Sequence, residues 1–229
     1  MRQLYLLLLL CLSASVVSGQ SYAFGVKAGP NLCIQQWNGF SRDPLIAWQG
    51  DLFLESHSDV TPSSLYLQLG YHIRGSKLRF NRYVNQNNQE VKPQSSKAKF
   101  QNIVLTAGAK RRHEFGSGMA YYQFGFRGEY TVDTQLGGYL ESYEGTENKL
   151  LFGVQVGGGY ELPLGEFVSG IFEITINPDF TKQIYLPRQD TGYTDLNGNR
   201  IIIQEQSVTN VSIEVSAGFR FLRKITYYD

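Results

Sequence analysis

Apolar and polar residues alternate with a period of two along most of the chain. In residues 22–29, aromatic and aliphatic side chains would share one face, and glycine and lysine the other. Such alternation is typical of β-strands with one apolar and one polar face. It recurs often enough to predict eight strands, at residues 22–29, 48–55, 65–74, 102–110, 120–129, 150–161, 168–177 and 211–221. The predicted fold class is all-β.

The connections between these predicted strands alternate in length. Long connections span residues 30–47, 75–101, 130–149 and 178–210, and short ones span 56–64, 111–119 and 162–167. In an up-and-down sheet, all long connections then leave at one end and all short turns at the other. Outer-membrane barrels have this arrangement, and a Greek-key sandwich gives no reason for it. The pattern predicts an eight-stranded antiparallel up-and-down transmembrane β-barrel with short periplasmic turns and long external loops.

Three features indicate that the apolar face of this barrel points outward, to lipid. Most strand glycines fall on the polar face, where a narrow lumen is crowded. Aromatic residues such as Trp48, Tyr71 and Tyr122 lie near strand ends, as in an interfacial girdle. The polar face also carries charges of both signs. If the faces were inverted, the chain would instead be a secreted, lipocalin-like binder of an apolar ligand.

The charges on the polar face predict a structural network of salt bridges inside the lumen. Five are basic and five are acidic: Lys27, Arg74, Lys110, Arg127 and Arg220, with Asp51, Glu55, Glu129, Glu173 and Glu214. Buried charges must be nearly balanced because an unpaired one is costly to bury. A pore is not expected, because side chains fill the interior of an eight-stranded barrel.

The first nineteen residues have the order of a secretory signal peptide. A short basic start precedes the apolar run Leu4–Leu12, and mostly small residues follow up to Gly19. The apolar run is too short to span a bilayer as a helix. We therefore expect a signal peptide at residues 1–19, a barrel domain at 20–229 and a location in the outer membrane. Cys33 would then be the one cysteine of the mature chain, an inert residue of the first loop.

Composition narrows the function without identifying it. The formal net charge is +1, and aromatic residues make up 14% of the chain. A nucleic-acid binder would carry a basic excess, so no nucleic-acid partner is expected. Three histidines and scattered cysteines show no transition-metal spacing. No metal and no cofactor are therefore predicted.

Two motifs in the chain invite a chemical interpretation. His72 lies on the lumen face, where a Ser–His–acid site with loop residues is conceivable, but a hydrogen-bonded lumen histidine beside Arg74 is the preferred interpretation. The run Asp195, Asn197, Gly198 and Asn199 resembles part of a calcium loop but lacks the full spacing. Asn197-Gly198 is better interpreted as a hairpin turn. These four residues are the predicted external contact loop.

The second long connection is rich in basic residues that could contact anionic lipopolysaccharide at the outer rim. They are Lys77, Arg79, Arg82, Lys92, Lys97 and Lys99. The expected partners are therefore outer-membrane lipid and lipopolysaccharide. A solvated loop is an equally good interpretation of the same residues.

The mature chain resembles the small outer-membrane barrels of the PorT-like family of Bacteroidetes. Phe24-Gly25-Val26-Lys27-Ala28-Gly29-Pro30-Asn31-Leu32 is similar to that family's first strand, and residues 69–76 and 218–221 also resemble family strands. A proline typical of the fourth strand is missing from Asn102-Ile103-Val104-Leu105. The resemblance implies the barrel fold and the outer membrane. It implies little about activity, because the family is functionally mixed.

Together these observations predict a monomeric, non-enzymatic barrel with a structural or protein-interaction role. Its external loops would be the contact surface, and an envelope or secretion machine could supply a protein partner. The alternative is an outer-membrane enzyme that modifies lipid, which would depend on His72.

Overall fold

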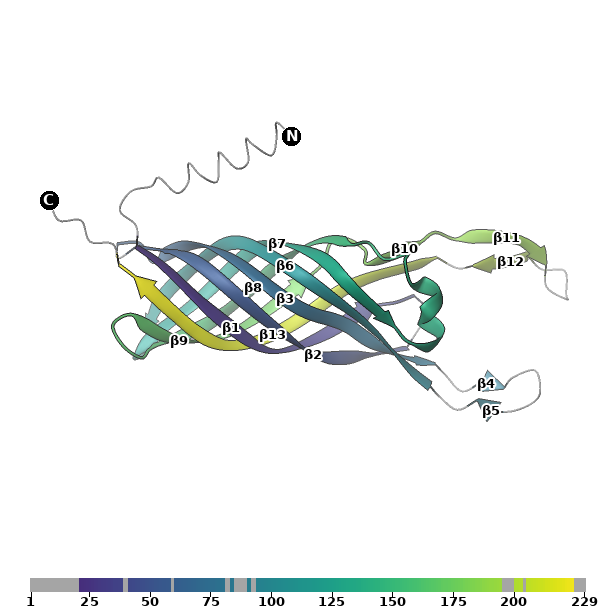
Figure 1. Cartoon of the computed structure of the whole chain (residues 1–229), viewed down its shortest axis with the longest axis horizontal. Helices are drawn as coiled ribbons and strands as arrows, with labels where there is room; N and C mark the ends of the chain where they lie inside the picture. The colour runs from purple at the N-terminus through teal and green to yellow at the C-terminus, as the bar shows by residue number, and fades with distance from the viewer. Residues whose placement is uncertain are drawn as a thin grey trace, which may run out of the picture.

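In the computed structural model, eight long antiparallel strands form a closed ring (Figure 1). These strands are β1 (Ser21–Gln36), β2 (Ser41–His57), β3 (Ser63–Phe80), β6 (Gln94–Phe115), β7 (Gly118–Leu136), β8 (Leu150–Pro163), β9 (Val168–Pro178) and β13 (Gln206–Arg223). Each strand pairs with the next in this order, and β13 pairs with β1. The structure describes residues 21–38, 41–58, 60–80, 83–84, 90–91, 94–194, 200–203 and 205–224. The predicted eight-stranded barrel is confirmed.

The two faces of the barrel wall are oriented as the alternation predicts. Trp48, Leu65 and Phe126 are 66%, 70% and 69% exposed on the outside. Most of the buried residues that face the lumen are polar or charged. Ring closure gives every strand two hydrogen-bonded neighbours, so the wall has no free edge in the lipid. This orientation excludes the lipocalin-like alternative, which requires an apolar interior.

The first connection is much shorter than predicted. β1 continues to Gln36 and β2 begins at Ser41, so the connection predicted at 30–47 comprises residues 37–40. Pro30 does not end β1, because it still pairs with Trp48 of β2 and only the pairing to β13 is interrupted, resuming at Asn31. One missing N–H donor is tolerated within such a long ladder. Interstrand hydrogen bonds thus extend the wall beyond the segment where alternation is clear.

The connection between β6 and β7 is also tighter than predicted. β6 ends at Phe115 and β7 begins at Gly118, so the connection predicted at 111–119 is a two-residue turn of Gly116 and Ser117. Gly116 has a φ of 63°, a left-handed conformation that favours glycine. As a result, Arg112 lies within a strand and faces the lumen.

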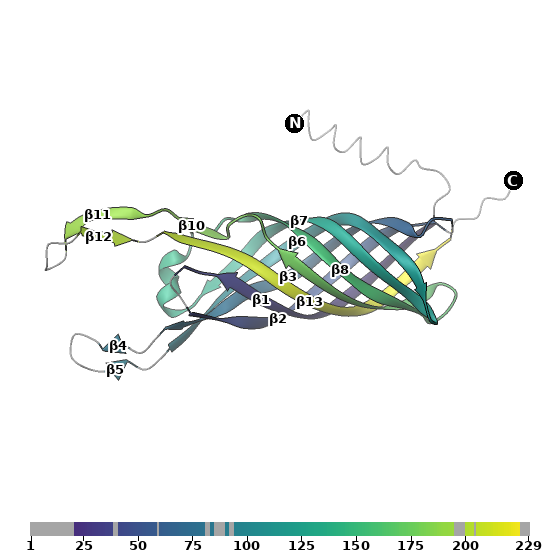
Figure 2. The same ribbon diagram turned by 180° about the vertical axis from the view of Figure 1, so that it is seen from behind.

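The turns between β2 and β3, β6 and β7, and β8 and β9 lie at one end of the barrel, and the other connections of the ring, including the short one between β1 and β2, lie at the opposite end (Figures 1 and 2). The outer end carries two hairpins, one of β4 (Tyr83–Val84) and β5 (Glu90–Val91) and one of β11 (Gln189–Thr194) and β12 (Arg200–Ile203). It also carries the short strand β10 (Ile184–Leu186) and the 3-10 helix η1 (Gly138–Tyr143). Within the described part of the chain, no helix is both long and apolar enough to cross a membrane. β11 and β12 pair as the predicted hairpin of the last connection.

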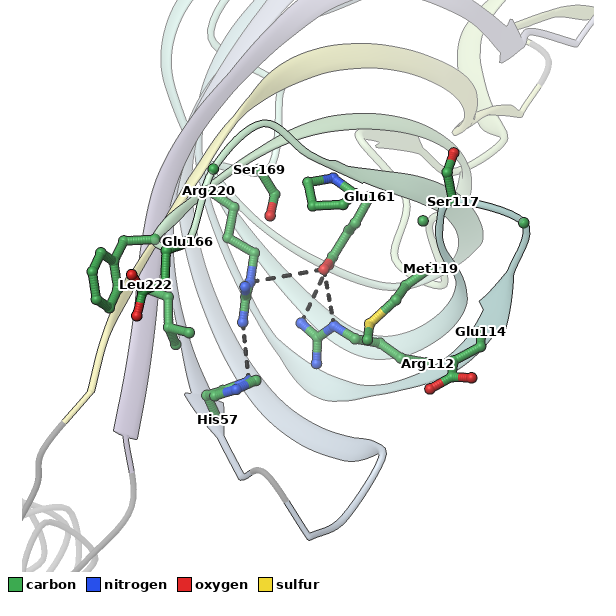
Figure 3. A pocket seen from close by; sticks show the side chains of 15 residues that line it. His57, Arg112, Glu114, Ser117, Met119, Glu161, Glu166, Ser169, Arg220 and Leu222 are labelled. Atoms are coloured by element: carbon green, nitrogen blue, oxygen red, sulfur yellow. Dashed lines mark hydrogen bonds and ion pairs between the residues drawn. The ribbon is translucent and has the colours of Figure 1, made fainter.

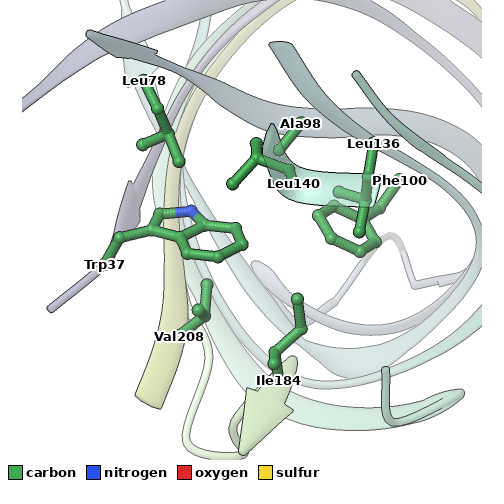
Figure 4. Close-up of a cluster of buried hydrophobic side chains, with 8 residues drawn as sticks. All are labelled: Trp37, Leu78, Ala98, Phe100, Leu136, Leu140, Ile184 and Val208. Carbon is green, nitrogen blue, oxygen red and sulfur yellow. The ribbon is translucent and has the colours of Figure 1, made fainter. Parts of the chain in front are cut away.

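The outer end of the lumen is closed by a cluster of apolar side chains, here called the outer plug (Figure 4). Its members are Trp37, Leu78, Ala98, Phe100, Leu136, Leu140, Ile184 and Val208. Tyr143 and Leu186 pack against it. The indole N–H of Trp37 donates to Gln35 Oε1 at 3.1 Å, so the largest member keeps a polar partner. The plug separates the polar lumen from the outside.

Candidate functional site

All ten residues of the predicted lumen network point inward, and each is at most 6% exposed: Lys27, Asp51, Glu55, Arg74, Lys110, Arg127, Glu129, Glu173, Glu214 and Arg220. Their contacts divide them into an outer cluster, a middle pair and a periplasmic cluster. The outer cluster consists of Asp51, His72, Arg74, Arg127, Glu129, Asp179 and Glu214. The middle pair is Lys27 and Glu173. The periplasmic cluster consists of Glu55, Lys110, Arg112, Glu161 and Arg220.

His72 lies at the centre of the outer cluster and is fully buried. Its Nε2 is 2.8 Å from Asp51 Oδ1, and its Nδ1 is 3.0 Å from Glu214 Oε1. Arg127 Nη2 is 2.9 Å from the same Nδ1. Because Asp51 is a carboxylate that only accepts, Nε2 carries the proton of that hydrogen bond. Both ring nitrogens are therefore occupied by lumen side chains, and His72 is placed as the hydrogen-bonded lumen histidine of the preferred interpretation.

Arg74 joins several carboxylates within the outer cluster. Its Nη1 is 2.8 Å from Glu129 Oε1 and 3.0 Å from Asp179 Oδ1. Its Nη2 donates to Ser212 Oγ at 2.9 Å. Asp179 is not among the predicted network residues, because it follows β9 in the connection predicted at 178–210. Asp179 continues the inward-facing positions 173, 175 and 177 of β9 one step beyond the strand, and a bridge to Gly153 and a hydrogen bond to Asn210 keep it in the wall beside Arg74.

The middle pair joins two strands that are separated in the ring by β13. Lys27 of β1 contacts Glu173 of β9 through its ammonium group, and Tyr121 donates to the second carboxylate oxygen of Glu173 at 2.8 Å. Below this pair, Phe53 and Ile171 pack with Tyr121 in a small buried apolar cluster. Phe53, which breaks the alternation of β2, thus points into the lumen rather than to lipid.

The periplasmic cluster contains two residues that the sequence analysis did not include. Arg112 donates to Glu161 through Nε at 3.1 Å and also contacts Glu55. Lys110 Nζ is 2.9 Å from Glu55, and Arg220 Nε donates to Glu55 at 3.1 Å. Arg112 was missed because 111–119 was predicted as a turn. Glu161 lay on the polar face of a predicted strand, so its position in the two-residue alternation could have identified it as a lumen residue.

These additions change the balance of charge in the lumen. Arg112 raises the number of basic residues from five to six, and Glu161 and Asp179 raise the acidic number from five to seven. His72 would supply a seventh positive charge when protonated. The charges are also unevenly placed. The periplasmic cluster has three bases and two acids, whereas the outer cluster has two arginines and four carboxylates beside His72.

Cys33 lies in the wall of the barrel rather than in a loop. Cys33 is a free, buried cysteine of β1 that faces the lumen, which corrects its predicted place in a loop. Its Sγ is 3.5 Å from Asn31 Oδ1.

The residues of the predicted external contact loop, Asp195, Asn197, Gly198 and Asn199, lie outside the described residues. Among the residues that are described, no group of His, Cys, Asp and Glu is arranged to hold a metal ion.

The outer rim carries lysines on the outward face of β3 and β6. Lys77 and Lys97 are directly opposite each other in the strand ladder. Lys99 follows on the same face of β6, where its neighbours Ala98 and Phe100 point inward. Arg79 is paired with Asp43 of β2. Like charges directly opposite each other are destabilising, so the rim favours an anion beside Lys77 and Lys97. Arg82 and Lys92 lie outside the described residues.

Comparisons with known proteins show the class of this protein. No protein-family model and no curated sequence matches the chain. The solved structure of OprG from Pseudomonas aeruginosa is similar with a TM-score of 0.53 at 9% identity, covering 90% of this chain and 98% of that one. A major outer membrane protein from Thermus thermophilus has a TM-score of 0.49 at 12% identity, with 89% and 99% covered. The outer membrane protease OmpT from Escherichia coli has a TM-score of 0.46 at 7% identity, with 90% and 98% covered.

At these identities, the likeness shows the fold alone. A closed ring of eight strands, an apolar outer surface and a polar lumen define an outer-membrane β-barrel. The protein belongs to this class and is located in the outer membrane. Because one fold serves many functions, its function must be argued from its sites.

Proposed function

We propose that the protein is a non-enzymatic barrel that acts through its external surface, as a scaffold or as a small subunit of an envelope machine. The observation that carries this proposal is the closed lumen. The outer plug covers one end, and the salt-bridge network fills the interior beneath it. The space beside Lys27 and Glu173 measures about 10 Å³, which is about one water molecule. A solute therefore has no path through the barrel.

The surroundings of His72 also favour a non-enzymatic role. A Ser–His–acid site requires a hydroxyl that donates to the histidine. Ser212 Oγ instead donates to Glu214 at 3.1 Å and accepts from Arg74. His72 is held between Asp51 and Glu214 and is fully buried, away from lipid. It is therefore positioned to stabilise the lumen.

The external end provides the surface for an interaction. The β4–β5 and β11–β12 hairpins project from this end (Figures 1 and 2). The lysines of the outer rim, Lys77, Lys97 and Lys99, suit the phosphate groups of lipopolysaccharide beside the barrel. A place in an envelope assembly is part of this proposal; the resemblance to PorT-like proteins implies the barrel fold and the outer membrane, and little about activity.

The proposal can be tested by site-specific photo-crosslinking in cells. A photo-reactive residue at Arg188, exposed at the base of the β11–β12 hairpin, should give a discrete adduct. The matched control is Val60, which is 89% exposed in a periplasmic turn. Replacing residues 191–200 with a glycine–serine linker should remove the Arg188 adduct while the barrel still shifts on heating in gels. Equal adducts at both positions, or an Arg188 adduct that survives the replacement, would contradict the proposal.

A further inference from the structure

A pocket opens at the periplasmic end of the lumen, opposite the surface of the proposed function (Figure 3). Its volume is about 380 Å³, within the range of small-molecule sites. The last inward-facing residues of the strands and the adjoining turns form its wall. Figure 3 shows Arg112, Glu161 and Arg220 together in its interior, with Glu114 and Glu166 on different sides of the mouth.

The pocket is blind. Phe53, Tyr121 and Ile171 pack together above it and close the lumen. Lys110 Nζ lies 4.2 Å from the centre of the Tyr121 ring, which joins this closure to the charged wall. The space beyond these residues, beside Lys27, is about 10 Å³. A ligand would therefore enter and leave from the periplasm alone.

The interior of the pocket has a positive surplus. Arg112, Arg220 and Glu161 line this interior, so two bases face one acid there. Lys110 and Glu55 belong to the same cluster without lining the pocket, and all five residues are at most 7% exposed. A buried charge without a counter-charge is costly, so this end of the lumen favours an added anion. Arg220 engages Glu55 through Nε and His57 Nδ1 through Nη2. Among the described residues its Nη1 has no such contact.

The mouth of the pocket has the opposite sign. Glu114 and Glu166 line it and are exposed. Met119, Phe167 and Leu222 provide apolar surface between the mouth and the charged interior. Carboxylates at the entrance disfavour ligands with several negative charges, and the arginines inside disfavour simple cations. The order of charge suits a small molecule with one anionic end, a short apolar middle and one cationic end.

We propose that this pocket binds a short zwitterionic peptide from the periplasm. Its terminal carboxylate would lie against the guanidinium group of Arg220, whose planar donors match a carboxylate. Arg112 would add a second positive charge beside it while donating to Glu161, Ser64 and Glu55. Its amino group would lie toward Glu114 and Glu166, and small side chains would contact Met119. His57 is a positioning residue, because its Nδ1 accepts from Arg220 at 3.1 Å and holds the guanidinium at the wall.

Calorimetric titration of the purified full chain in detergent micelles tests this site with three probes. Alanyl-alanine should bind saturably. Its carboxyl-terminal amide should bind about ten-fold or more weakly, because it loses the charged hydrogen bonds to arginine. Its N-acetyl form should bind only about two- to five-fold more weakly, because exposed carboxylates contribute little. No saturable binding of alanyl-alanine, or equal binding of the amide, would overturn the proposal.

Two variants and one control locate the binding. Met119→Trp should abolish binding by filling the mouth without altering the charges of the interior. Arg220→Gln should weaken the free peptide and leave the amide unchanged. Arg79→Gln, at the outer rim and 66% exposed, is the matched control and should bind like the wild type. A heat-dependent gel shift confirms that each variant folds. If Met119→Trp binds alanyl-alanine normally, the site is wrong, whatever the outcome for the external surface.

Discussion

The middle pair offers the sharpest test of how the lumen is stabilised. Lys27 and Glu173 are each at most 6% exposed and lie on strands that are not neighbours in the ring. Tyr121 donates to Glu173 at 2.8 Å. Lys27→Met removes the ammonium group and leaves a buried carboxylate with that hydroxyl as its remaining neutral donor. Glu173→Gln removes the carboxylate and leaves a buried ammonium.

The expected magnitudes follow from the cost of an unpaired buried charge. Each single variant should lower the free energy of unfolding by about 3–5 kcal/mol, a hundred-fold to several-thousand-fold change in the folding equilibrium. The double variant buries no unpaired charge, and the glutamine carbonyl can still accept from Tyr121. It should lie within about 1–2 kcal/mol of the wild type. The two substitutions should therefore be strongly non-additive.

Reversible unfolding by urea in phospholipid vesicles measures these values. The two tryptophans, Trp37 and Trp48, report the transition by fluorescence. Arg79→Met is the matched control, because it breaks an exposed ion pair and should cost less than about 1 kcal/mol. Single variants that cost under about 1 kcal/mol, or a double variant equal to the sum of the singles, would refute the reasoning.

Three further predictions concern the plug, the rim and the buried histidine. Trp37→Ala should lower the free energy of unfolding by about 3–5 kcal/mol because it leaves a cavity in the plug. The variant should still show no single-channel conductance in planar bilayers, because the salt-bridge network fills the lumen beneath the plug; steady conductance would contradict this. Replacing Lys77 and Lys97 together with glutamine should raise stability in neutral detergent by about 0.2–1 kcal/mol and reduce the gain in Tm on adding lipopolysaccharide; an undiminished gain would remove the anion site. His72→Ala should leave the lipid A mass spectrum of cells unchanged, and an altered acylation pattern would favour the enzyme instead.

The alternation of the chain was sufficient to predict the ring because of how a barrel wall contacts its surroundings. Each residue of the membrane-spanning wall faces either the lipid or the lumen, so an apolar residue indicates the lipid side and a polar residue the lumen side. A proline or a run of charged residues interrupts this pattern. The loop predicted at 30–47 begins at Pro30, but Leu32 and Ile34 still alternate with the inward-facing Asn31, Cys33 and Gln35, and β1 continues to Gln36. β6 likewise includes Arg112, because the charged run at 111–114 has no apolar alternation to mark a strand.

The members of the candidate sites were less predictable than the strands. The alternation of inward and outward positions along each strand placed Lys27, Arg74 and Glu214 in the lumen. The same alternation extends to Asp179, which continues the inward positions of β9, but that residue was missed because 178–210 was predicted as a loop. The outer plug was not predicted either, because all its residues come from segments that were predicted as loops, including the outer ends of β3 and β6 and the helix η1.

The sequence by itself determined the period of the strands and the side on which each regular residue lies. These are local properties, set by the two-residue repeat of a strand and the chemistry of each side chain. The tertiary structure alone decided which charges meet. Lys27 and Glu173 are 146 residues apart, and His72 and Glu214 are 142 apart. Ring closure and strand stagger bring them together, and the same closure leaves the positive surplus at the periplasmic pocket.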